Sequence, residues 1–249
     1  MVKVNKDFQD IPASLISERT NNKRKEIIAN GEYDKSGDKY YRKQDIKDTL
    51  KAIYYNKCAY CEQYIEEFHV EHYRPKSLYY WLAFSWDNLL LVCPKCNTKK
   101  LHKFPISGDR QSFDDSFTRD IHNLISIHDS NENPLIINPE QDDPEMYFSF
   151  DKEGHIMENS DNPRGITTIE ECGLNRTDLV DRRKGKFDEL INSINAYLFI
   201  EQYDDTAKIK AMVVIEQFIN SSKNPKKEFL AFRRYILTHL LRDSINIVR

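Results

Sequence analysis

Apolar positions recur every three to four residues in the first part of the chain, a period typical of amphipathic helices. Residues 11–55 show this spacing among many lysines and arginines. Residues 31–39 interrupt it with a polar stretch that contains two glycines. The pattern therefore predicts a mainly helical N-terminal region with one break.

The last part of the chain, from Thr177 onward, also has helical spacing, with breaks near Asp205 and at residues 220–225. An apolar stripe at helical spacing follows the second break: Phe229, Phe232, Ile236 and Leu240. Such a stripe is more typical of core packing than of a partner-binding face, which is the alternative.

The middle of the chain changes to shorter apolar stretches, which are typical of strands. Residues 63–73 and 86–93 predict two short strands, and residues 94–103 predict a helix directly after the second. Residues 146–150 and 155–157 are expected to pair as a second hairpin. Together these elements predict an α+β protein that is mostly helical.

A very short helix is expected beyond that hairpin. Thr167 and Glu170 have the spacing of a capping box, which marks a helix start. Gly173 is a suitable C-terminal cap.

The composition excludes wholesale disorder and a membrane protein. Of 249 residues, 39% are hydrophobic and 12% aromatic, enough for a core, and the mean hydropathy is −0.70. The longest apolar runs are far shorter than the roughly 20 residues of a membrane span. The first residues lack the apolar segment of a secretory signal, so the expected location is the cytoplasm.

The net charge of −3 conceals an uneven distribution. Residues 104–180 carry 17 acidic and 5 basic side chains, whereas residues 74–103 carry 6 basic and 1 acidic. The total argues against a generally basic nucleic-acid coat protein. It leaves open a nucleic-acid enzyme with a local cationic face.

Four of the five cysteines form two C-x-x-C pairs, which are Cys58 with Cys61 and Cys93 with Cys96. Each pair can present two thiolates to one ion, and two pairs complete a tetrahedral Zn²⁺ shell. Redox disulfides are the alternative, but the βαβ pattern that usually accompanies them is absent. A closed Cys₄ shell leaves no position for water, so this zinc is structural and any catalysis lies elsewhere.

Three short motifs lie between and just after the cysteine pairs: Val70–Ser77 (VEHYRPKS), Trp86–Leu89 (WDNL) and Cys96–Lys100 (CNTKK). They contain a histidine that can act as a base, oxygen ligands for a hard cation and cations for phosphate. With the cysteine pairs, these motifs resemble the zinc-knuckled HNH (ββα-metal) endonucleases. Within that family they are similar to the PtuB-like nucleases of Septu-type anti-phage systems, some of which accompany retrons.

The resemblance implies a zinc-stabilised ββα-metal core, treble-clef-like, embedded in a mostly helical protein. It divides the chain into an N-terminal helical region (1–53), an HNH core with the Cys₄ site (54–110), an acidic region of loops and short strands (111–180) and a C-terminal helical region (181–249). The similarity extends from residue 11 to 180 and is densest at 57–105.

The resemblance also implies a single-metal mechanism. His72 is the expected general base, and Glu71 with Asn97 is expected to hold catalytic Mg²⁺ or Mn²⁺. Asn88 is expected to orient the imidazole of His72. Three of these residues have an ordinary alternative: a loop histidine or an extra zinc ligand at His72, a helix cap at Asn97 and a turn residue at Asn88. Glu71 stands where the family more commonly has Asp or His, but its longer side chain can still bind a cation.

Nucleic-acid phosphates are expected to contact four basic side chains, which are otherwise solvated charges: Arg74, Lys76, Lys99 and Lys100. His69 and His102 are weaker candidates for an additional ligand. The aromatic segment 79–86 fits packing of a small zinc module better than a stacking platform for bases.

The family implies a partner as well as a chemistry. A PtuA-like ATPase of the ABC/SMC type is expected in a hetero-complex, and the chain itself has no phosphate-binding G-x-x-x-x-G-K-[ST] loop. A retron reverse transcriptase with its non-coding RNA/DNA is a further expected partner. DNA is the expected substrate and RNA the alternative; a non-catalytic zinc module or regulatory scaffold is the competing function.

Overall fold

The computed structural model describes residues 1–198 and 205–244. Helices dominate, with two separate two-stranded sheets. The N-terminal helices are α1 (Ala13–Ile16), α2 (Glu18–Asn30), α3 (Asp38–Tyr41) and α4 (Gln44–Tyr54). This arrangement confirms the predicted helical region with its break, which the left-handed Gly31 begins.

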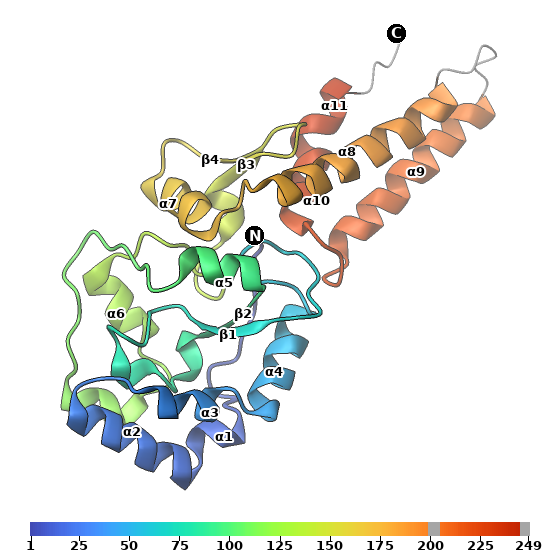
Figure 1. Cartoon of the computed structure of the whole chain (residues 1–249). Helices are drawn as coiled ribbons and strands as arrows, with labels where there is room; N and C mark the ends of the chain where they lie inside the picture. Colours follow the sequence, from blue (N-terminus) through green and yellow to red (C-terminus); the bar gives the residue numbers. More distant parts are fainter. Residues whose placement is uncertain (199–204, 245–249) are drawn as a thin grey trace.

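The centre of the molecule is a ββα unit. Strand β1 (His69–His72) pairs antiparallel with β2 (Leu89–Val92), and α5 (Pro94–Lys100) follows directly (Figure 1). The register places Glu71 opposite Leu90. All four residues of β2 are buried, and α4 packs against this strand. The two strands and the helix lie within the predicted segments, so this part of the prediction is confirmed.

The aromatic segment 79–86 supplies much of the core around this unit. Tyr79, Trp81, Phe84 and Trp86 are at most 2% exposed. Tyr79 packs edge-on against Trp81 and against Phe104. The burial of these four side chains confirms that the segment mainly packs the module; Tyr80 is half-buried.

The acidic region contains α6 (Ile125–Glu132), β3 (Phe148–Phe150), β4 (Ile156–Glu158) and α7 (Pro163–Cys172). Strands β3 and β4 form the predicted hairpin. The predicted start of the short helix is wrong, because the side chain of Asn162 caps α7 and Pro163 occupies its first position. Thr167 lies inside that helix, whereas the predicted cap at Gly173 is confirmed.

The C-terminal region is a helical hairpin followed by a short helical end. The elements are α8 (Thr177–Leu198), α9 (Asp205–Lys223), α10 (Leu230–Tyr235), a π-helical turn (Ile236–Leu240) and α11 (Leu241–Ser244). Helices α8 and α9 pack side by side, and their hairpin projects away from the end that carries α1–α3 (Figure 1).

The buried stripe of this region is part of the common core. Phe229, Phe232 and Ile236 are at most 2% exposed, and Phe232 packs against Phe150 of β3. The preference for core packing over partner binding is therefore confirmed at these positions. Buried side chains form one continuous cluster through all four segments of the chain, so the proposed division into regions stays a prediction. No helix within the described residues is long and apolar enough to cross a membrane.

Candidate functional site

Two tight turns bring the four paired cysteines together. The first turn precedes β1, where the backbone N–H of Glu62 donates to Cys58 and Glu62 adopts φ +60°. The second turn starts α5, where Cys93 is the N-cap and its sulfur accepts from the N–H of Cys96. The four sulfurs lie within 4.8 Å of one another and all four residues are buried. This donor set fits the predicted tetrahedral zinc.

Arg176, which the sequence reasoning did not single out for this role, lies against the cysteine cluster. Its guanidinium nitrogens are 3.3 Å from Cys96 Sγ and 3.5 Å from Cys61 Sγ. Four thiolates around Zn²⁺ carry a net charge of −2, so an adjacent guanidinium offsets part of it. The signal that could have found this residue is its place within residues 11–180, the part of the chain that resembles the family.

His72 ends strand β1 and is buried. Its Nε2 lies 2.9 Å from the carbonyl oxygen of Ala83. A carbonyl only accepts hydrogen bonds, so Nε2 carries the proton and Nδ1 keeps its lone pair. Burial, reinforced by the charge of Lys76, lowers the pKa of His72 to about 3. The imidazole is therefore neutral near pH 7 and has the form that a general base requires.

Glu71 lies on β1, and Asn97 lies on α5, the helix that follows β2. Glu71 has one carboxylate oxygen in an ion pair with Lys100, at 2.8 Å, and no hydrogen bond to the other from the described residues. Asn97 is half-buried, and its side-chain amide also makes no hydrogen bond within that part of the chain. Asn97 precedes the inward-facing Lys100 by three residues, so both lie on one face of α5. A carboxylate oxygen and an amide oxygen that make no hydrogen bonds are suitable ligands for a hard divalent cation.

The structure corrects the expected role of Asn88. Among the hydrogen bonds of the described residues, none joins its side chain to the imidazole of His72. Instead it accepts from the backbone N–H of Arg74 at 2.7 Å and donates to the carbonyls of Arg74 and Leu82. Because Leu82 precedes Ala83, whose carbonyl lies at His72 Nε2, Asn88 helps to fix the loop that positions the imidazole of His72.

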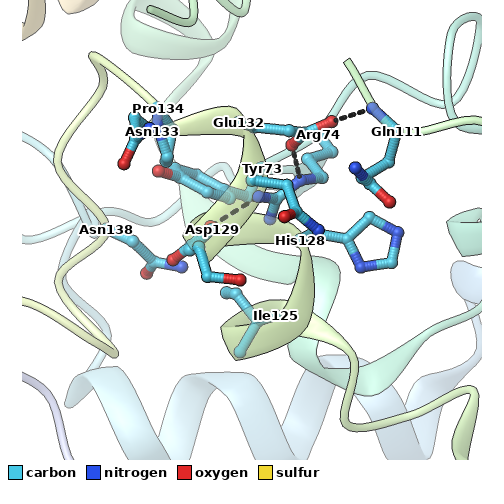
Figure 2. Close-up of polar contacts among 12 residues, drawn as sticks. Tyr73, Arg74, Gln111, Ile125, His128, Asp129, Glu132, Asn133, Pro134 and Asn138 are labelled. Atoms are coloured by element: carbon cyan, nitrogen blue, oxygen red, sulfur yellow. Dashed lines mark hydrogen bonds and ion pairs between the residues drawn. The ribbon is translucent and has the colours of Figure 1, made fainter. Parts of the chain in front are cut away.

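The structure also corrects two of the four expected phosphate contacts. Arg74 is 1% exposed, and its guanidinium forms ion pairs with Asp129 and, at 2.7 Å, with Glu132. Figure 2 shows this guanidinium between the two carboxylates of α6. Lys100 is fully buried, with its ammonium on Glu71 and on the carbonyl of His72. Neither side chain is free to bind a phosphate.

The other basic candidates are accessible. Lys99 is exposed on α5, with its stem against Gly173. Lys76 is half-buried, and its Nζ lies 2.9 Å from Tyr41 Oη. His69 and His102 are exposed, and neither belongs to a group of possible metal ligands among the described residues.

Comparisons with known proteins agree with this geometry. Residues 58–103 match the model of the HNH endonuclease family. The chain is 32% identical over 162 residues to the Septu protein PtuB of Bacillus mycoides (strain KBAB4), covering 57% of this chain and 51% of that protein. It is 30% identical over 174 residues to PtuB of Bacillus thuringiensis, covering 67% and 52%.

A further match is to the Septu protein PtuA of Bacillus mycoides (strain KBAB4), with 29% identity over 177 residues, 65% of this chain and 23% of that protein. The chain spans about half the length of its PtuB relatives. The matched segment contains the cysteine cluster, His72 and Asn97. Residues 58–103 are therefore an HNH endonuclease domain whose Cys₄ cluster fits a zinc knuckle, and the chain is homologous to the PtuB proteins of Septu systems.

Proposed function

We propose that the protein is a metal-dependent endonuclease that hydrolyses phosphodiester bonds of nucleic acid. The observation that carries the proposal is the neutral His72, whose Nε2–H is held by Ala83 and whose Nδ1 is available as a base. His72 follows Glu71 on strand β1. Neither residue belongs to the cysteine cluster of the ββα unit.

The reaction uses this chain's residues in distinct roles. Nδ1 of His72 takes a proton from water, and the oxygen of that water attacks phosphorus in line with the leaving 3′-oxygen. Glu71 and Asn97 would hold Mg²⁺ or Mn²⁺, which would supply positive charge beside the scissile phosphate. Asn88 keeps the loop that fixes His72 in place.

DNA is the substrate we propose first, with RNA as the alternative. The direct test incubates the protein with plasmid DNA and with single-stranded RNA, in Mg²⁺, in Mn²⁺ and in EDTA. Cleavage is expected with either cation and not in EDTA. Binding of nucleic acid without cleavage under any of these conditions would favour the competing function, a non-catalytic zinc module or regulatory scaffold.

We further propose that the protein acts in the cytoplasm with a PtuA-like ATPase, in a complex for defence against phage. One Bacillus mycoides strain supplies both a PtuB and a PtuA relative, which supports a two-component system. A retron reverse transcriptase and its nucleic acid remain a further proposed partner. Expressing the protein from its native operon and purifying it would detect these partners, because they would co-purify with it.

The attachment surface for the ATPase is proposed on the projecting α8–α9 hairpin. Helix α9 exposes three apolar side chains, Ile209 at 61%, Met212 at 67% and Val213 at 44%. Deleting the C-terminal region would also remove buried residues such as Phe187 and Phe232, so point substitutions are the better test. Ile209→Glu with Met212→Glu is expected to abolish co-purification of the ATPase while leaving the melting temperature unchanged; retained co-purification would exclude this surface.

A further inference from the structure

A nuclease that attacks a phosphodiester must hold the anionic backbone on both sides of the scissile bond. Backbone phosphates are bound mainly by lysine and arginine. Arg74 and Lys100 cannot serve, because both are buried in ion pairs within the protein. The cations beside His72 must therefore be found elsewhere in the molecule.

The N-terminal region supplies a residue that touches the base directly. Tyr41, at the end of α3, is 1% exposed and packs edge-on against the imidazole of His72, with ring centroids 4.5 Å apart at 83°. This contact joins residues 31 positions apart. Tyr41 also lies outside residues 58–103, the segment that matches the HNH family model.

The hydroxyl of Tyr41 is a junction of three polar partners. It donates to Asp38 Oδ1 at 3.0 Å, which leaves its oxygen to accept. It accepts from Lys76 Nζ at 2.9 Å and from a guanidinium nitrogen of Arg42 at 3.3 Å. Lys76 and Arg42 therefore both place their charged groups at the hydroxyl of Tyr41, the residue whose ring contacts His72.

Both cations remain available to a ligand. The side chain of Arg42 is 55% exposed and that of Lys76 is 28% exposed. Asp38 pairs with Arg42 at 2.9 Å and lies 3.7 Å from Lys76, so it holds these side chains while neutralising only one charge. Lys39 and Lys43 lie on either side of Tyr41 in the sequence, so residues 38–43 carry a net positive charge.

We propose that Arg42 and Lys76 bind the phosphodiester backbone next to the bond attacked at His72, and that Tyr41 is the positioning residue for both. The inference rests on the proposed nuclease function and extends its site beyond the HNH segment. A guanidinium suits bidentate contact with a phosphate, and an ammonium suits a point contact. The ligand class is the sugar-phosphate backbone, irrespective of base.

The first test measures binding without turnover. Fluorescence anisotropy with a labelled duplex DNA and with an RNA, in EDTA, compares wild type with Arg42→Ala and Lys76→Ala. Each substitution should weaken binding about 5- to 10-fold at 0.1 M salt and reduce the slope of log affinity against log salt by about one. Arg182→Ala, an exposed arginine paired with Glu228, is the matched control and should bind as wild type.

The outcomes separate this inference from the function on which it rests. If wild type binds and cuts nucleic acid while Arg42→Ala and Lys76→Ala match it in affinity and salt slope, the phosphate assignment is wrong. If wild type neither binds nor cuts DNA or RNA, the proposed function itself fails. The relative loss on DNA and on RNA shows which backbone the two residues favour.

The second test isolates the hydroxyl of Tyr41. Tyr41→Phe keeps the ring on His72 but removes the oxygen that holds Arg42 and Lys76. We expect KM for nucleic acid to rise about 3- to 5-fold with kcat within 2-fold of wild type, because the base is untouched. An unchanged KM and salt slope in Tyr41→Phe would overturn the positioning role and leave Tyr41 as a packing residue.

Discussion

The two ends of the ββα unit are built in different ways. At the zinc end, each pair of ligands comes from one tight turn, and the shell closes with four thiolates. At the histidine end, His72 depends on Ala83 for its tautomer and on Tyr41 for its ring contact, and these come from separate segments. The difference fits the proposed division of labour, in which the zinc end holds the fold and the histidine end carries out the chemistry.

Of the changes that test this difference between the two ends, removing zinc should have the largest effect, which is on folding stability. Structural zinc contributes roughly 10–16 kcal/mol to folding in zinc-finger peptides, as much as the whole stability of many domains. Cys61→Ser is therefore expected to lose zinc and the cooperative thermal transition. Metal analysis and circular dichroism provide the measurement.

Cys172→Ser is the control for that experiment, because Cys172 is buried outside the cluster. It should retain about one zinc per chain. A Cys61→Ser protein that melts like wild type without zinc would show that the cluster does not hold the fold.

Arg74→Met should have the next largest effect, which is a loss in the free energy of unfolding. The substitution leaves the buried Glu132 and the half-buried Asp129 without their partner, and breaking a buried pair such as Arg74–Glu132 costs about 3–5 kcal/mol. Urea denaturation measures the loss, and adding Glu132→Gln should recover part of it. Lys99→Met, on the exposed face of α5, should change stability by about 0.5 kcal/mol or less. A stable Arg74→Met protein with weakened nucleic-acid binding would restore the phosphate role.

Arg176→Met should have the smallest effect, confined to the zinc end. Loss of a side chain that contacts metal ligands typically lowers metal affinity 10- to 100-fold. We expect faster transfer of zinc to a chromophoric chelator, with nucleic-acid affinity unchanged. Arg182→Met serves as the control for removing a guanidinium from the same region. Zinc transfer at the wild-type rate would show that the contacts to Cys61 and Cys96 do not stabilise the cluster.

Local features were predictable from the sequence because neighbouring residues determine them. The C-x-x-C turns, the two strands with their helix and the hairpin at 148–158 all depend on short-range spacing. The start of α7 was missed within this class, because Asn162 followed by Pro163 is a stronger helix start than the capping-box spacing at Thr167.

The wrong predictions of phosphate contacts failed because of long-range partners. In the sequence Arg74 is indistinguishable from an accessible cation, but the structure pairs it with Glu132 of α6, 58 residues later in the chain. The same holds for Lys100, which pairs with Glu71 of β1. Asn88 acts through backbone groups, which the sequence pattern does not reveal. The roles of Glu71, Asn97 and Lys76 stay predictions.

The most direct test of the account compares His72→Ala with His69→Ala, a change at an exposed histidine on the same strand. Cleavage in Mn²⁺ and zinc content are measured on the same preparations. We predict that His72→Ala loses at least about 100-fold in cleavage rate, as expected for a general base, while keeping one zinc per chain. His69→Ala should cut as wild type. Equal cleavage by wild type and His72→Ala would contradict the assignment of catalysis to the histidine end.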